Sequence, residues 1–186
     1  MRYVLVTPPV DPPVGLEEAK AHLRIDDAHT DRLLEQCLEA AAGYLDGRFG
    51  VLGRALNAQT WRLDTAAPDH QGKVALDLPP VTAVTKVSVR QGAEAVTWPS
   101  TDWRLDHYDA RAFVVPAYGK SWPWCDQRSD AISVTFTAGQ GVPPPIRQAI
   151  LLLTEVFYEA GPATAPALVE VPFGVSALIE PWRNRR

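Results

Sequence analysis

The sequence predicts an α+β protein, in which a small α-helical bundle formed by the N- and C-terminal helices carries an inserted all-β block. Apolar residues recur with a helical period in residues 14–56 and again after residue 141, and they alternate with a period of two in between. Paired prolines separate these segments. We therefore expect residues 1–56 and 141–186 to be the two helical parts, and residues 57–140 to be the β insertion.

The N-terminal part is expected to hold two helices. Residues 1–13 are predicted to be extended because their paired prolines forbid a helix. A short helix follows in "LEEAKAHL", and a stronger one follows Thr30, which is predicted to be its N-cap. Gly47 or Gly50 is predicted to end this second helix in a left-handed conformation. Its predicted apolar stripe consists of Leu34, Cys37, Leu38, Ala41 and Leu45.

The middle of the chain is predicted to form about six or seven short strands. In "QTWRLD" the residues Gln59, Trp61 and Leu63 alternate with polar ones, and "AISVTFT" shows the same pattern most clearly. A turn at "QGAE" joins two such runs and predicts a hairpin. The other expected strands lie in "KVALDL", "TKVSVR", "AVTW", "DWRL" and "RAFVV".

The C-terminal part is predicted to hold one long and one short helix. "IRQAILLLTEVFYEA" begins directly after three prolines, which suit the first turn of a helix, and its apolar residues cover most of its surface. The short helix carries Val175, Leu178 and Ile179 on one side, and Pro181 is expected to end it.

Composition argues against several classes of protein. The chain has 18 basic and 22 acidic side chains, so a broad basic surface for gripping nucleic acid is not expected. No segment has the apolar length of a membrane span, and no membrane partner is predicted. The two cysteines, Cys37 and Cys125, are expected to be reduced thiols.

No catalytic, cofactor or metal site stands out, so the chain is predicted not to be an enzyme. The nearest candidate is His107 between Asp106 and Asp109, which has two interpretations: three metal ligands, or a polar turn between strands. The turn is favoured, because Asp is common in turns and the histidines show no ligand spacing on a helix.

An aromatic stretch, "YGKSWPWCDQ", invites two further interpretations. Tyr118, Trp122 and Trp124 with Lys120 could stack the bases of single-stranded nucleic acid, which defines an alternative function as a nucleic-acid-binding module. The same four residues could instead form an aromatic lid over the end of the β block or contact another subunit. These interpretations are favoured because large aromatics dominate protein–protein contacts.

The order of several segments resembles the head–tail connector (adaptor) proteins of long-tailed bacteriophages and of phage-like gene transfer agents. The resemblance covers nearly the whole chain. Gly15 departs from the Thr or Ser that related chains often have there, but glycine also suits a helix N-cap. The segments are "LEEAKAHLRID", "QTWRLD", "LPPVTAVTKVSV", "VTFTAGQGVPPPIRQAILLLTEVFYE" and "PFGVSALIEPWR".

This resemblance implies a structural adaptor without a cofactor. Such proteins dock on the portal ring of the capsid, extend the DNA channel and present a surface to a tail-completion protein (a stopper or terminator). About twelve copies are then expected as a ring on a twelve-fold portal, with the free chain a monomer or weakly associating. DNA would pass through without specific binding. Such a protein would occur in the bacterial cytoplasm during assembly and then in the neck of the particle.

In the resembled family the C-terminal segment lodges against the portal. Trp and Arg are the residues most enriched at binding hot spots, which fits this chain's ending, "LIEPWRNRR". The alternative is a last helix packed on its own bundle with a solvated basic end. For Val175 and Leu178 the two alternatives are balanced, and from Trp182 onward docking on a partner is favoured. The portal-docking residues that the resemblance implies are Leu178, Ile179, Trp182, Arg183, Arg185 and Arg186.

Overall fold

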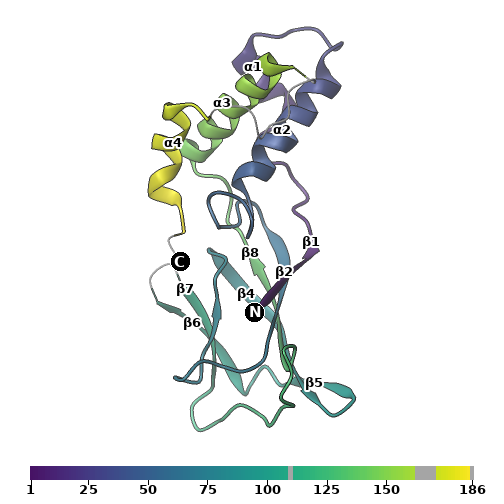
Figure 1. Cartoon of the computed structure of the whole chain (residues 1–186), viewed down its shortest axis with the longest axis vertical. Coiled ribbons are helices and arrows are strands. Elements are labelled where there is room, and N and C mark those ends of the chain that lie inside the picture. Colours follow the sequence, from purple (N-terminus) through teal and green to yellow (C-terminus); the bar gives the residue numbers. More distant parts are fainter. Residues whose placement is uncertain (109–110, 162–170, 185–186) are drawn as a thin grey trace. The chain divides into compact units, whose positions relative to one another are not determined.

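A computed structural model describes residues 1–108, 111–161 and 171–184. The chain forms two compact units, one built from Met1–Val10 with Ala58–Gln140, and the other from Asp11–Asn57 with the chain from Gly141 onward. We call the first the β unit and the second the helical unit. Both are coloured along the sequence in Figure 1.

The described residues of the helical unit form four α-helices: α1 (Leu16–Leu23), α2 (Asp31–Leu45), α3 (Pro144–Ala160) and α4 (Phe173–Ile179). A 3₁₀ turn, η2 (Glu180–Trp182), follows α4. Helices from both ends of the chain pack together, α2 on α3 and α3 on α4, as the sequence predicts. The predicted stripe of α2, from Leu34 to Leu45, is buried in this core together with Ile146, Ile150 and Leu153 of α3.

The starts and ends of these helices agree with the sequence in part. Gly15 occupies the N-cap of α1, and Gly47 adopts a positive φ of 77° just after α2, as expected. Thr30 lies at the N-cap of α2, but its side chain makes no cap hydrogen bond. Its φ and ψ are −100° and −2°, and its hydroxyl oxygen is buried without a partner among the described residues. Since N-cap residues normally adopt extended angles, this helix-like backbone explains the missing cap.

The β unit consists of two antiparallel sheets. The five-stranded sheet has the order β1-β2-β8-β4-β5, and the three-stranded sheet has the order β3-β7-β6. The block after residue 57 contains seven strands, the upper number that the sequence predicts: β2 (Gln59–Thr65), β3 (Val74–Leu76), β4 (Val81–Gln91), β5 (Glu94–Trp98), β6 (Trp103–Tyr108), β7 (Arg111–Pro116) and β8 (Ile132–Ala138).

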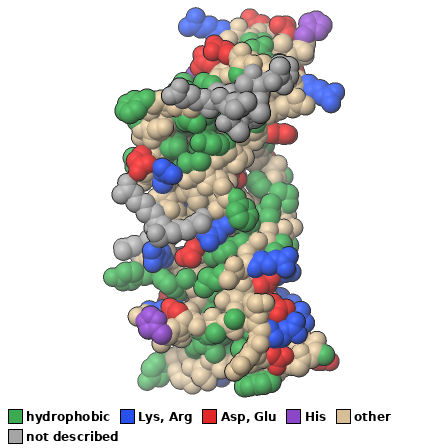
Figure 2. Space-filling model, in the orientation of Figure 1, with side chains coloured by type: hydrophobic (Ala, Val, Ile, Leu, Met, Phe, Trp, Pro, Cys, Tyr) green, Lys and Arg blue, Asp and Glu red, His purple; other side chains and the backbone are tan. Residues whose placement is uncertain are grey.

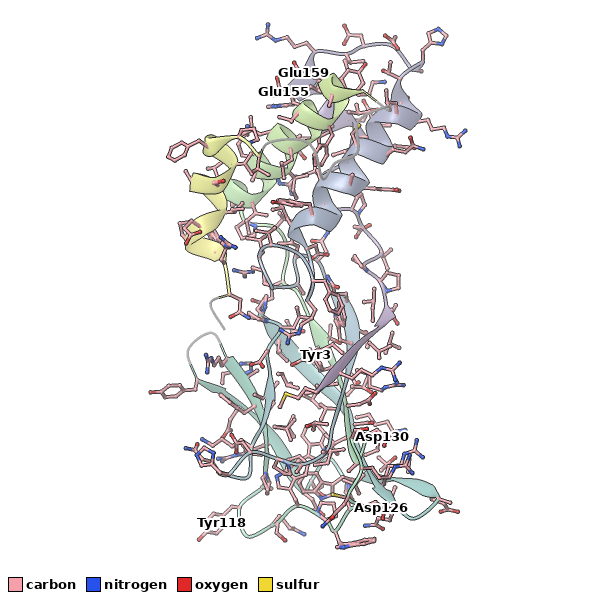
Figure 3. The ribbon with its side chains drawn as sticks, viewed as in Figure 1. Tyr3, Tyr118, Asp126, Asp130, Glu155 and Glu159 are labelled. Carbon is pink, nitrogen blue, oxygen red and sulfur yellow. The ribbon has the colours of Figure 1, made fainter. Side chains whose placement is uncertain are left out.

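One further strand, β1 (Arg2–Thr7), joins the five-stranded sheet from the N-terminus. The sequence predicts extended structure here but not a strand partner, because β1 pairs with β2 across more than fifty residues. The hydroxyl of Tyr3 accepts a hydrogen bond of 2.9 Å from the backbone N–H of Asp77, which attaches β1 to the segment after β3 (Figure 3).

The core of the β unit follows the predicted alternation. Along β2 and β8 the inward residues Trp61, Leu63, Val134 and Phe136 are buried, while Arg62, Thr135 and Thr137 between them are partly exposed. Val74, Leu76 and Val114 of the three-stranded sheet are buried as well. The outward positions of both sheets are therefore free to carry polar contacts and binding surfaces.

Candidate functional site: the C-terminal segment and the aromatic loop

The C-terminal segment, Phe173–Asn184, begins with α4, whose first turn follows Pro172. The α-helix ends at Ile179 and the chain continues through the η2 turn, which contains Pro181. A proline has no backbone N–H to continue the helical hydrogen bonds, so the predicted end near Pro181 has this simple cause.

The apolar side of α4 is attached to the helical unit's own core. Val175 and Ile179 are buried, and Leu178 and Trp182 pack partly against the same cluster. Among the residues expected to dock on the portal, Ile179 is thus already used inside the chain. Phe173 is 87% exposed on the same helix, and the sequence analysis did not single it out because it lies off the apolar stripe.

The end of the segment rests on the loop between α2 and β2. The backbone N–H of Asn184 donates to the carbonyl oxygen of Leu52 at 2.8 Å, and its side-chain amide donates to that of Gly53 at 3.2 Å. The loop is itself ordered by Asp46, whose carboxylate accepts a 2.8 Å hydrogen bond from the backbone of Leu56. A side chain on Gly50 would collide with the backbone oxygen of Asp46, so only glycine fits this turn.

Arg54 and Trp182 also contact each other in this region. The guanidinium carbon of Arg54 lies 5.3 Å from the centre of the Trp182 ring, within the range of a cation–π interaction. Burial lowers the pKa of Arg54, and its Nε has no hydrogen-bond partner among the described residues. Trp182 thus contacts an arginine whose Nε makes no hydrogen bond to the described chain.

The basic end is only partly described. Arg183 is half-exposed and pairs with Glu180 at 3.3 Å, one turn earlier. Arg185 and Arg186 lie outside the described residues. On the surface shown in Figure 2, Lys and Arg side chains are interspersed with Asp and Glu side chains.

The aromatic loop, residues 117–130, joins β7 to β8. Tyr118 is fully exposed and points away from the strands in Figure 3, and Trp124 is 71% exposed. Trp122 is different: its indole N–H donates to the carbonyl oxygen of Gly72 at 2.7 Å, and its ring lies 4.6 Å from that of Trp98. Trp122 therefore fastens the loop, whereas the rings of Tyr118 and Trp124 remain exposed to solvent.

Polar contacts hold the rest of this loop against the β4–β5 hairpin. Gln91 donates a 2.9 Å hydrogen bond to the carbonyl oxygen of Trp124, and the backbone N–H of Gly92 donates to the carboxylate of Asp126 at 3.2 Å. Lys120 pairs with Asp102 at 3.1 Å. The Arg128 guanidinium, which donates to the carboxylate of Asp130, lowers the pKa of that group. The loop thus presents its two exposed rings on a fixed backbone, with its lysine already paired.

The remaining sequence candidate lies around His107, at the end of strand β6. Asp106 and His107 lie in β6, and Asp106 pairs with Arg104 at 3.0 Å. Asp109 lies outside the described residues. Within the described part of the chain, no group of three or more His, Cys, Asp or Glu residues could hold a metal ion, and no helix is long and apolar enough to cross a membrane.

Comparisons with known proteins connect these features to a family. Residues 14–91, which run from α1 to the end of β4, match the model of the phage gp6-like head–tail connector proteins. Over this stretch, which is less than half of its length, the chain is similar to that family. The resemblance seen in the sequence is thereby confirmed. The family that this stretch matches consists of structural connectors rather than enzymes. No curated protein matches its sequence.

Solved structures extend the similarity to the whole chain. It is 28% identical to a chain in the neck of an empty gene transfer agent particle computed with C6 symmetry, with a TM-score of 0.78. It is also 28% identical to a chain in the virion of a native gene transfer agent particle (TM-score 0.77), and to one in the neck of a native particle computed with C12 symmetry (TM-score 0.71). Each match covers 100% of this chain and 97% of the other.

Proposed function

We propose that this protein is an adaptor in the neck of a gene transfer agent or a related tailed particle, where it docks on the portal ring and receives the tail. One observation carries the proposal: the full-length likeness to a neck chain, at 28% identity and a TM-score of 0.78. Because the likeness includes both the helical unit and the β unit, it supports a role for the whole chain. The protein would be made in the bacterial cytoplasm and end in the neck.

The C-terminal segment is proposed to dock on the portal. Its apolar base, Val175 and Ile179, is buried in the helical unit. Trp182 packs only partly against the same core, and residues 182–184 are otherwise attached through one ring contact and a few hydrogen bonds. We therefore propose that α4 stays on its bundle and that Trp182, Arg183, Arg185 and Arg186 meet the portal, with Leu178 at the edge of the contact.

We further propose that about twelve copies form a ring around the DNA channel. Support comes from the C12 symmetry with which the neck of one similar structure was computed. The exposed rings of the aromatic loop, Tyr118 and Trp124, suit a contact with a tail-completion protein, because rigid aromatic side chains lose little conformational entropy on binding. The nucleic-acid alternative is not favoured, since Trp122 packs internally and Lys120 is paired with Asp102.

The deciding experiment measures binding of the full chain to a purified portal ring from the same particle. Three forms are compared: the intact chain, a form ending at Pro181, and a triple variant with Arg183, Arg185 and Arg186 changed to Gln. We expect the truncated form to lose most of its binding, because the hot-spot aromatic and all three cations are removed together. The triple variant should bind about tenfold more weakly and show a smaller dependence on salt.

A matched control distinguishes the loss of specific docking contacts from the effect of losing three positive charges. The variant Arg24→Gln/Arg32→Gln/Arg111→Gln changes three exposed arginines elsewhere and alters the net charge equally. It should bind like the intact chain. Equal binding by all forms would show that the docking surface lies elsewhere, whereas no binding by any form, together with retention on DNA, would contradict the adaptor role.

A further inference from the structure

The five-stranded sheet has an open edge on each side. On one side, β1 is the outermost strand, and β2 is its only partner among the described strands. At the other side, β5 covers β4 only from Val87 to Gln91. The first half of β4, Val81–Lys86, therefore has β8 on one side and no strand among the described residues on the other.

The strand register shows that these two edges correspond. Leu5 lies beside Trp61, Trp61 beside Phe136, and Phe136 beside Val84. The neighbouring row runs in the same way from Val4 to Lys86. Each row of paired residues therefore begins in the open stretch of β1 and ends in the open stretch of β4, on the opposite side of the sheet.

The direction of the strands also fits. All three pairings from β1 to β4 are antiparallel, so β1 and β4 run in opposite directions. If a second copy is placed beside the first by a rotation about an axis along the strands, its β1 lies antiparallel to the β4 of the first. A heterologous contact of this kind repeats from copy to copy, and it closes a ring when the rotation between copies divides a full turn evenly.

The apolar row supplies a reason for the edges to meet. Its two central residues, Trp61 and Phe136, are 5% and 0% exposed, while Leu5 at one end is 43% exposed and Val84 at the other end is half-buried. Joining Leu5 of one copy to Val84 of the next would continue this row across the contact and remove both ends from water.

We propose that neighbouring copies of the connector pair β1 with Val81–Lys86 of β4, which joins their five-stranded sheets edge to edge. The proposal rests on the proposed function, since it names the contact that would hold the ring. Strand addition to an open edge is an established mode of protein recognition, with backbone hydrogen bonds giving affinity.

The edges also carry features that keep this pairing weak in solution. Lys86 is exposed on the open edge, and β4 shows two irregularities in its register, between Val81 and Ala83 and between Val84 and Lys86. Charged residues and bulges are the usual means by which open edges avoid indiscriminate pairing. The contact would then form when a portal ring holds many copies close together.

Disulfide cross-linking tests this contact directly. The double variant Leu5→Cys/Val84→Cys is prepared with Cys125→Ser, while the buried Cys37 is retained. Within one chain the two positions are three strand spacings apart, or about 14 Å, which is beyond the reach of a disulfide. Any disulfide between them must therefore join two copies. We expect oxidation on the portal ring to convert most of the protein into a ladder of covalent multimers that extends beyond dimers.

Matched variants identify the edge. Leu5→Cys/Val96→Cys replaces the β4 position by Val96 of β5, which is 42% exposed and so more accessible than Val84, and should give no ladder. Each single cysteine variant should give dimers at most. A ladder from the Val96 pair, or none from the Val84 pair while the portal is bound, would overturn the proposal and leave the adaptor role standing. If the portal is not bound at all, the adaptor role fails, and the absence of a ladder in concentrated protein then overturns the edge contact as well.

Discussion

The C-terminal segment and the aromatic loop both expose aromatic side chains, but the chain holds them in different ways. The segment has a buried apolar base, Val175 and Ile179, and a loosely attached end in which Trp182 contacts Arg54. The loop is fastened along its length, by Trp122 in the middle and by contacts to Gln91 and Gly92 further on.

This difference suggests two ways of presenting a binding residue. An end that is held by few contacts can leave the chain and adapt to a partner, at the cost of the entropy lost when it becomes ordered there. A loop with a fixed backbone has already lost that entropy, so its exposed rings can bind a partner without rearrangement. The segment therefore suits docking that accompanies assembly, and the loop suits a preformed contact.

The largest expected effect comes from the base of the C-terminal segment. Ile179→Ala should lower the free energy of unfolding of the helical unit by about 3 kcal/mol, because it leaves a cavity in a core where Ile179 is 4% exposed. Urea unfolding followed by circular dichroism measures this. Leu178→Ala, next to it but only partly buried, is the control and should cost less than about 1 kcal/mol. Equal costs for the two variants would mean that α4 is not anchored through Ile179.

The second effect concerns the residue that fastens the aromatic loop. Trp122→Ala removes the contact with Trp98 and leaves the carbonyl oxygen of Gly72 without its donor, so it should destabilise the β unit by about 2 kcal/mol. Trp124→Ala, in the same loop, should change stability by no more than about 0.5 kcal/mol because that ring is largely exposed. Thermal unfolding of both variants provides the test, and a large loss for Trp124→Ala would show that its ring is structural.

The sequence predicts what depends on local periodicity. The stripe from Leu34 to Leu45 and the alternation around Trp61 are both found, because a helix or strand with one buried face must repeat its apolar residues at a fixed spacing. Pro181 and Gly47 likewise affect only the backbone conformation of adjacent residues at the ends of helices. Elements whose cause is local could therefore be predicted from the residues alone.

Features that depend on distant partners could not be predicted. β1 gains its partner from β2, and Trp122 gains its acceptor from Gly72, fifty residues earlier. Trp122 and the exposed Trp124 are separated by one proline, so the sequence offers no signal to distinguish the ring that fastens the loop from the ring that faces outward. The same holds for Asn184, whose contacts lie with the loop after α2.

A third prediction tests how loosely the end of the C-terminal segment is held. Arg54→Ala removes the cation–π contact with Trp182, which is worth about 1 kcal/mol, and should increase the rate of tryptic cleavage after Arg183 by about fivefold. Mass spectrometry of the intact protein measures the shortened product. Arg32→Ala, on the exposed side of α2, should leave the rate unchanged. An unchanged rate in the Arg54 variant would mean that the hydrogen bonds of Asn184 alone set the attachment.

The smallest effect is a pH dependence at the far end of the aromatic loop. The Arg128 guanidinium lowers the native pKa of Asp130 below its ordinary value of 3.8, so the native carboxylate stays ionised at a pH where the unfolded chain has begun to bind the proton. The resulting stability is present above pH 3.8 and is lost as the pH falls through the native pKa. Asp130→Asn should therefore lower the Tm slightly at pH 7 and leave it unchanged at the lowest pH where the protein still folds. Because both side chains are partly exposed, raising the salt concentration should shrink the difference at pH 7. A Tm difference that is the same at both pH values would show that the hydrogen bond, rather than the charge of Asp130, holds the loop in place.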